Sequence, residues 1–135
     1  MSSDHLAQVA TLSIPSDAGY LAVSRQALVG AVAGLPLGDE ELDDLKLVLS
    51  EICANAIVHA YGGRPDGCID VTFRRSEREL EVTVADAGPG FPEGRVPDTF
   101  GAGLTLLDRL CARHTIEPRR SQGGAAVTFA HSVTR

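Results

Sequence analysis

The chain has 135 residues, of which 44% are hydrophobic and 22% charged, and its formal net charge is −6 at pH 7. This composition is typical of a globular domain rather than a disordered or fibrous protein. The acidic balance argues against direct binding to nucleic acid, which needs clustered cations. The first residues have neither a basic stretch nor an apolar run, and the longest apolar stretches are only a few residues, so we expect no signal peptide and no membrane span. The length is typical of one domain, which we place over residues 1–135 and expect in the cytoplasm.

Cysteine and histidine follow no metal-binding pattern. The three cysteines form no CxxC pair, and the four histidines lack HxxxH and HExxH spacing. We interpret the cysteines as reduced structural thiols and expect no zinc site. The residues concerned are Cys53, Cys68 and Cys111, and His5, His59, His114 and His131.

The first half of the chain predicts a strand followed by two helices. Residues 6–14 alternate loosely between apolar and polar side chains, and a turn with a capping residue follows at Pro15-Ser16-Asp17. Apolar residues at helical spacing predict a helix from residue 18 to about Gly34. A second, longer helix is predicted from Asp39-Glu40-Glu41, whose charges suit a helix start, to about residue 60, before Tyr61-Gly62-Gly63.

The second half consists mostly of predicted strands. Asp66-Gly67 opens a hairpin whose strands alternate over 69–73 and 80–84, each with one buried face. A Gly/Pro-rich loop covers 88–97, a short helix 104–112, and two strands about 114–118 and 125–131. This order predicts an α+β fold, a two-layer α/β sandwich in which the helices cover one face of a mixed, mostly antiparallel sheet.

The second helix carries a polar ridge. Glu51, Asn55 and His59 recur every four residues, so their side chains share one side of the helix. The apolar ridge lies roughly 90° away, which places the polar ridge at the edge of the core, where it would border a pocket. A solvated helix face with a stray asparagine explains the same pattern. The apolar ridge consists of Leu42, Leu45, Leu49, Ile52 and Ala56.

Asp86 continues the inward phase of the second hairpin strand, after Val82 and Val84. A buried carboxylate is costly unless it accepts hydrogen bonds, and neither Lys nor Arg lies near it in the sequence. A ligand amine could supply the missing donor. An isolated Asp-x-Gly is also a common turn cap, so the residue alone leaves both interpretations open.

Two pairs of glycines follow Asp86. Gly88 and Gly90 let the backbone turn sharply and approach a flat ligand. Gly101 and Gly103 precede a predicted helix, whose free N–H groups favour anionic phosphates. Neither pair fits the Walker A loop or the dinucleotide fingerprint, and each pair alone is a weak signal.

Taken in order, these segments resemble the N, G1 and G2 boxes of the GHKL ATPases, the Bergerat-fold superfamily that includes gyrase, histidine kinases and MutL. The matching segments are Glu51 to Tyr61, Asp86 to Phe91 and Gly101 to Leu104. Within the superfamily, the chain looks most like the bacterial anti-sigma-factor kinases of the RsbW and SpoIIAB kind, whose N-box has a similar Asn-Ala-Ile-x-His-x-Tyr pattern. The resemblance covers residues 8 to 131.

The resemblance implies a serine/threonine kinase that binds ATP and Mg²⁺. By this likeness, Asn55 would be the metal ligand, Asp86 would accept a hydrogen bond from the adenine amine, and Glu51 would be the catalytic general base. The backbone of the glycine-rich segments would shape the adenine wall and hold the phosphates. The residues implied there are Gly88, Gly90, Gly101, Gly103, Leu104 and Thr105.

The resemblance also implies partners. The phosphoacceptor would be a serine or threonine of an anti-anti-sigma protein of the STAS type, and the other partner would be a sigma factor held inactive. Such a kinase would regulate transcription by sequestration, without touching DNA. The resemblance also implies that the chain forms a homodimer.

Three departures from the relatives keep other functions open. The loop between Gly90 and Gly101 has only ten residues, Thr99 stands where some relatives have an arginine, and Ala125 stands where relatives often have a threonine. The short loop and Thr99 favour an alternative, a non-catalytic nucleotide-dependent binding module that sequesters its partner. A third possibility is a relative that keeps the fold and no longer binds nucleotide.

Overall fold

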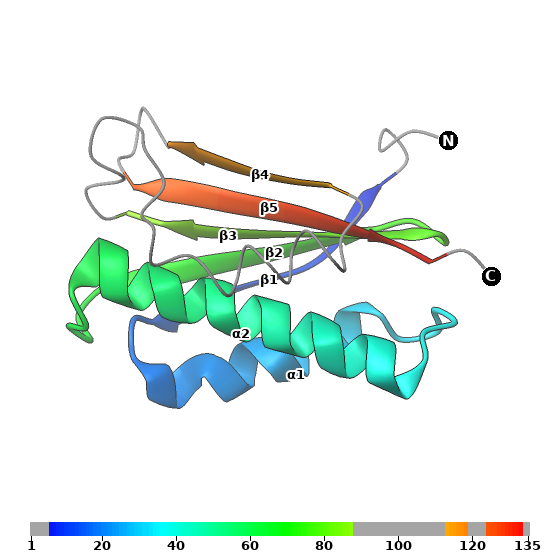
Figure 1. The fold of residues 1–135 in the computed structure, drawn as a ribbon, viewed down its shortest axis with the longest axis horizontal. Helices are drawn as coiled ribbons and strands as arrows, with labels where there is room; N and C mark the ends of the chain where they lie inside the picture. The colour runs from blue at the N-terminus through cyan, green and yellow to red at the C-terminus, as the bar shows by residue number, and fades with distance from the viewer. Residues whose placement is uncertain (1–5, 88–112, 119–123, 134–135) are drawn as a thin grey trace.

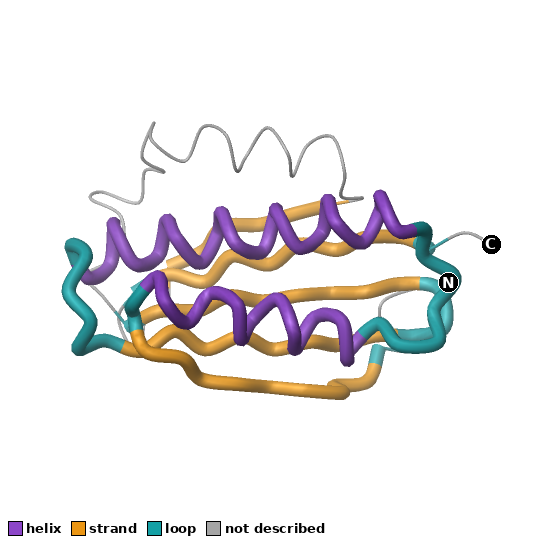
Figure 2. The backbone as a smooth tube through the Cα atoms, turned by 90° about the horizontal axis from the view of Figure 1, so that it is seen from below, coloured by secondary structure: helices purple, strands orange, loops and turns teal. Residues whose placement is uncertain are grey.

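The computed structural model describes residues 6–87, 113–118 and 124–133 (Figure 1). Two helices lie side by side on one face of a five-stranded sheet, and no described element covers the other face (Figures 1 and 2). The elements in chain order are β1 (Ala7–Pro15), the short 3-10 helix η2 (Ala18–Tyr20), α1 (Leu21–Ala31), α2 (Asp39–Tyr61), β2 (Cys68–Arg75), β3 (Glu79–Asp86), β4 (Arg113–Pro118) and β5 (Ala125–Ser132).

The sheet has the strand order β1-β2-β3-β5-β4. Every pairing between the described strands is antiparallel. The register places Ile69 opposite Asp86 and Ala85 opposite Ala126, so that the last residue of β3 lies beside the start of β5. The predicted α+β two-layer sandwich with a mostly antiparallel sheet is confirmed, and its described part contains no parallel pair.

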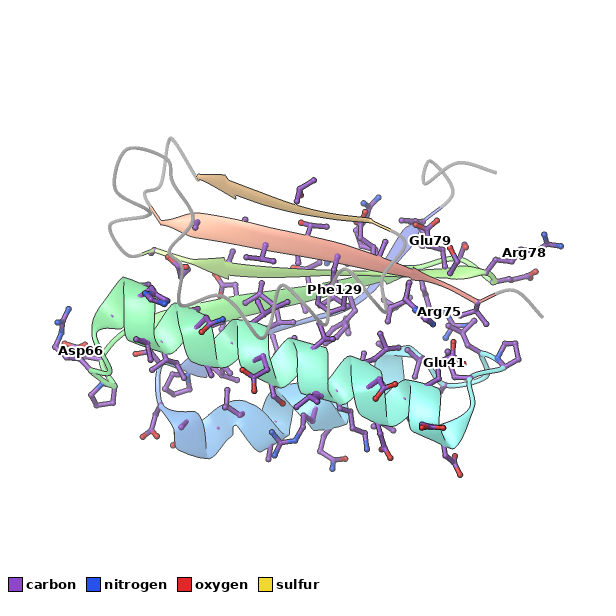
Figure 3. All side chains as sticks on the ribbon, viewed as in Figure 1. Glu41, Asp66, Arg75, Arg78, Glu79 and Phe129 are labelled. Atoms are coloured by element: carbon purple, nitrogen blue, oxygen red, sulfur yellow. The ribbon has the colours of Figure 1, made fainter. Side chains whose placement is uncertain are left out.

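The hydrophobic core lies between the sheet and the two helices. The alternation predicted for the hairpin is confirmed, since the inward apolar side chains of β2 and β3 are at most 2% exposed. Burying each such side chain contributes about 1.5–3 kcal/mol to folding. These side chains are Ile69, Val71, Phe73, Leu80, Val82 and Val84. Phe129 on β5, labelled in Figure 3, extends this core toward α2 and is fully buried.

The first helical segment is shorter than the sequence predicted. The Asp17 carboxylate accepts a hydrogen bond from the Gly19 N–H at 2.9 Å and so caps η2, after which α1 begins at Leu21. The helix ends at Ala31 instead of near Gly34. Gly34 has a φ of 85°, a left-handed conformation that glycine adopts readily and that cannot continue a right-handed helix.

The second helix, α2, matches its predicted bounds. Glu41 accepts a hydrogen bond from the Gly38 N–H at 3.2 Å, which satisfies one of the free donors at the helix start. The helix ends where Gly62 and Gly63 adopt φ angles of 59° and 81°. The predicted apolar ridge faces the core, with Leu45, Leu49 and Ile52 buried and Leu42 and Ala56 partly buried. Neither helix within the described residues is long and apolar enough to cross a membrane.

Candidate functional site

Asp86 lies at the end of the molecule where α2 finishes and β3 ends (Figure 1). Its side chain is buried, with 8% of the residue exposed, as the strand phase predicted. The Ala125 N–H donates a hydrogen bond of 3.2 Å to Oδ1 of Asp86. Because a buried carboxylate needs donors, this backbone N–H helps to hold the carboxylate in an oriented state at the strand end.

Gly124 makes this contact between β3 and β5 possible. Its φ is 87°, and a Cβ atom built on it would lie 2.0 Å from the backbone oxygen of Asp86 and 2.7 Å from its Oδ1. No other residue type could bring the turn before β5 so close to the end of β3. The close approach is what delivers the Ala125 N–H to the carboxylate.

The polar ridge of α2 is half-buried along its length, at Glu51, Asn55 and His59. Half-burial fits a ridge at the border of the core, which is where the sequence placed it. Glu51 and Asn55 are one helical turn apart, about 6 Å along the axis. The ridge therefore offers a carboxylate and an amide oxygen in the same direction.

The ridge faces away from α1. Ser50 accepts a hydrogen bond of 3.1 Å from Arg25 of α1, whereas Glu41 contacts His131 of β5. With about 100° per residue, Asn55 points about 40° from the direction of Glu41 and about 140° from that of Ser50. In agreement, α1 packs over β1 and β2 and α2 over β2 and β3 (Figure 2). Asn55 thus lies on the flank of α2 that faces the β5 side of the sheet.

The last residue of α2, Tyr61, connects the helix to the two strand ends. Its hydroxyl donates to the Cys68 carbonyl at 2.7 Å and accepts from the Ala87 N–H at 2.9 Å. Since Ala87 directly follows Asp86, the contact holds the end of α2 beside the buried carboxylate. The structure therefore brings Asp86 to the end of the same helix that carries Glu51 and Asn55.

The remaining predicted site residues lie outside the described residues, and so do Thr99, the predicted loop 88–97 and the predicted helix 104–112. Their roles stay predictions from the motif resemblance. They are Gly88, Gly90, Gly101, Gly103, Leu104 and Thr105.

The described groups fit a magnesium nucleotide chemically. Mg²⁺ prefers oxygen ligands, which the Asn55 amide can provide. A nucleobase amine needs a hydrogen-bond acceptor, and the Asp86 carboxylate, oriented by Ala125, is one. The chemistry possible at this end of the molecule is therefore nucleotide binding with a carboxylate available for proton transfer.

Comparison with known proteins defines the class of this protein. A family model described as a histidine kinase-like ATPase domain matches residues 14–131. The chain therefore belongs to the histidine kinase-like ATPase domain family. This membership agrees with the motif resemblance and with the sandwich fold.

Within this family, the chain is similar to the serine-protein kinase RsbW. It is 39% identical to RsbW of Bacillus pumilus over 124 residues, which cover 90% of this chain and 72% of that protein. It is 34% identical to RsbW of Bacillus subtilis over 122 residues, which cover 90% and 71%. The predicted resemblance to kinases of the RsbW kind is thereby confirmed.

Solved structures support the fold. The crystal structure of the RsbU and RsbW domains of Rv1364c from Mycobacterium tuberculosis matches with a TM-score of 0.66 at 22% identity, and the match covers 94% of this chain and 33% of that one. The histidine kinase domain of a blue-light activated histidine kinase from Erythrobacter litoralis matches with a TM-score of 0.53 at 21% identity, covering 98% and 66%. At these identities the likeness concerns the fold alone.

Proposed function

We propose that this chain is an ATP-dependent anti-sigma factor with serine/threonine kinase activity. The observation that carries the proposal is the placement of Asp86, a buried carboxylate held by the Ala125 N–H at the end of the helix that bears Glu51 and Asn55. Similarity to the RsbW serine-protein kinases over 90% of the chain supports it.

In this function, ATP binds with its base at the end of β3. Asp86 accepts a hydrogen bond from the adenine amine through its carboxylate. The glycine-rich segments complete the site around the base and the phosphates. They contribute Gly88, Gly90, Gly101, Gly103, Leu104 and Thr105, as the motif resemblance implies.

Phosphoryl transfer needs positioning and charge neutralisation more than covalent chemistry from the protein. Asn55 would hold Mg²⁺ through its side-chain oxygen, and the bound metal would supply charge neutralisation at the ATP phosphates. The oxygen of a serine or threonine hydroxyl attacks the terminal phosphorus, and ADP leaves with the bridging oxygen. Glu51, one turn before Asn55, takes the proton of the attacking hydroxyl.

The partners follow from the kinase class. The phosphoacceptor is an anti-anti-sigma protein of the STAS type, and the sequestered partner is a sigma factor. The net charge of −6 fits a regulator of transcription that acts on proteins and does not grip DNA. The chain is expected to act in the cytoplasm as a homodimer.

Labelling with radioactive ATP tests the kinase. Incubation of the chain with labelled ATP, Mg²⁺ and its anti-anti-sigma partner should label the partner. Glu51→Ala should abolish the labelling and leave nucleotide binding intact. Glu40→Ala is the matched control, because Glu40 is an exposed acid in the first turn of the same helix.

The possible outcomes separate the candidate functions. Labelling by Glu51→Ala at the wild-type rate would show that Glu51 is not the base. ATP binding without phosphoprotein over hours would favour the non-catalytic binding module. Calorimetric titration with ATP that gives no heat in either wild-type protein or Asp86→Asn would show that the fold no longer binds nucleotide.

A further inference from the structure

Tyr61 makes more contacts than the end of a helix requires. It is 9% exposed, and its hydroxyl has a hydrogen-bond acceptor and a donor within 2.9 Å, at Cys68 and Ala87. A buried tyrosine hydroxyl must find partners, and here both partners are backbone atoms, one in β2 and the other directly after β3. The hydroxyl is therefore bound to main-chain positions, which cannot swing away as side chains can.

The two partners occupy the next step of the β2–β3 ladder. The last paired residues of the two antiparallel strands are Ile69 and Asp86, so Cys68 and Ala87 would face each other one step further on. The Tyr61 hydroxyl bridges the carbonyl of the first and the N–H of the second. The side chain thus extends the ladder beyond Asp86. It gives a hydrogen-bond partner to the Cys68 carbonyl and to the Ala87 N–H, where the pairing of β2 with β3 has ended.

The ring of Tyr61 is held from the other side by the loop before β2. A Cβ atom on Gly67 would lie 2.3 Å from Cε1 of the ring, so only glycine allows this packing. Ser16 fixes Gly67 in turn, because its hydroxyl accepts from the Gly67 N–H at 3.0 Å and its own N–H donates to the Gly67 carbonyl at 3.0 Å. The same hydroxyl donates to the Arg64 carbonyl at 2.5 Å. The ring is therefore clamped as well as bonded.

We propose that the Tyr61 hydroxyl is a positioning group for nucleotide binding, which fixes the place of Asp86 relative to Asn55. Asn55 lies one and two-thirds turns earlier on the same helix, about 9 Å along the axis. Because the helix is rigid, the position of Asn55 fixes that of Tyr61. The contact of Tyr61 with Ala87 then fixes the position of the neighbouring Asp86. The role rests on the proposed function, because it assumes that these two residues hold opposite ends of one nucleotide.

Tyr61→Phe is the direct test, because it removes the hydroxyl and keeps the ring against Gly67. Calorimetric titration with ATP and Mg²⁺, well below the melting temperature, should show an affinity roughly three- to tenfold lower than wild type, the range expected for one lost hydrogen bond. In the phosphorylation assay, the KM for ATP should rise by a similar factor, with kcat within about twofold of wild type.

A second readout follows Asp86 without nucleotide. Amide hydrogen exchange of Ala125, whose N–H donates to Asp86, should become faster in Tyr61→Phe than global unfolding accounts for. A merely structural tyrosine would lower the melting temperature and leave both the ATP affinity and this local exchange unchanged. Tyr20→Phe is the matched control, since Tyr20 is 45% exposed, and it should be neutral in all three measurements.

The results distinguish this role from the proposed function. If wild-type protein binds no ATP, the proposed function fails and this role fails with it. If wild type binds ATP and Tyr61→Phe binds it equally well, the positioning role is overturned and the kinase proposal stands. Should Tyr61→Phe not fold, Ser16→Ala removes one support of Gly67 and should weaken ATP binding about twofold or more; unchanged binding there would also overturn the role.

Discussion

The two ends of α2 are tied to the sheet in different ways. At its C-terminal end, Tyr61 bonds to main-chain atoms of Cys68 and Ala87, beside the buried Asp86. At its N-terminal end, the Glu41 carboxylate contacts the His131 ring of β5, a contact between two side chains. Figure 3 shows Glu41 near one end of the sheet and Asp66, in the loop that follows α2, at the other.

The two kinds of contact should affect different properties, the position of a strand end at Tyr61 and the free energy of unfolding at Glu41. A contact to main-chain atoms fixes where a strand end lies, and the strand end at Tyr61 carries a predicted ligand-binding carboxylate. A contact between two long side chains contributes free energy but leaves the backbone able to adjust. Substitutions at the Tyr61 end should therefore change nucleotide binding, whereas substitutions at the Glu41 end should change only the free energy of unfolding.

The largest expected effect is that of Gly124→Ala at the Asp86 end. The new Cβ would overlap the backbone of Asp86 in addition to the strain of a positive φ. We expect a loss of about 2–4 kcal/mol in the free energy of unfolding, measured by urea denaturation, together with loss of ATP binding.

Gly34→Ala is the control for the backbone conformation. Gly34 has nearly the same φ, 85° against 87°, but a Cβ on it would meet nothing within 4 Å. It should cost only about 1–2 kcal/mol and leave ATP affinity unchanged. Equal losses for the two glycines would contradict the importance of the approach to Asp86.

The contact between Glu41 and His131 gives the next largest effect. Both side chains are mostly buried, with 24% and 14% exposed, so the contact is only partly screened by solvent. His131→Ala should lower the free energy of unfolding by about 1–2 kcal/mol. In a double-mutant cycle with Glu41→Gln, the two losses should not add, because they remove the same contact. If His131→Ala lowered ATP affinity by more than about twofold, the Glu41 end of α2 would affect nucleotide binding as well as stability, which would contradict the comparison of the two ends.

Arg75 provides a smaller test at the same end as Glu41, where Figure 3 labels both side chains. Its guanidinium donates to the carbonyls of Ala31 at 2.9 Å and Ala33 at 2.7 Å, which lack helical partners at the end of α1. Arg75→Met should destabilise the fold by about 1 kcal/mol without altering ATP affinity. Arg78→Met, at an exposed position on the neighbouring turn, should have almost no effect on unfolding.

The last effect concerns the middle of α2 and is absent near neutral pH, so it is the smallest under ordinary assay conditions. Burial raises the pKa of the Cys53 thiol to about 12, and a hydrogen bond with Ser24 offsets only part of this rise. The native state keeps a proton that the unfolded state loses above its ordinary pKa of 9.0, so stability should fall as the pH rises from 9.0 toward about 12.

Alkylation with iodoacetamide at pH 8, followed by peptide mapping, checks the same thiol. Cys53 is free and buried, whereas Cys68 is free and exposed, so Cys68 should react in native protein and Cys53 only after unfolding. Modification of Cys53 at the rate of Cys68 would mean that the centre of α2 opens locally.

Local patterns in the sequence predicted most of the elements. The two-residue alternation of Val82 and Val84 gave the correct inward face of β3 and carried it to Asp86, because strand side chains alternate strictly. The acidic start and the Gly62-Gly63 end bounded α2 correctly, because helix ends depend on local capping. The end of α1 was wrong by three residues, since apolar spacing continued to Leu35 while the backbone had already turned.

The contacts between distant segments were beyond such patterns. Glu41 and His131 are 90 residues apart, and neither is in a motif that points to the other. Tyr61 was predicted only to end a helix, although a buried tyrosine hydroxyl before two glycines is a signal that it needs partners. The Ala125 N–H could not be assigned to Asp86 because the pairing of β3 with β5 skips the intervening β4.

The sequence alone determined most of the described helices and strands, the polar ridge of α2 and the order of motifs that identifies the family, because periodicity, capping and spacing are properties of neighbouring residues. The tertiary structure alone decided that Asp86 meets the end of α2 through Tyr61 and receives the Ala125 N–H. These contacts depend on strand order and register, which the whole core selects when it packs and which short stretches of sequence do not encode.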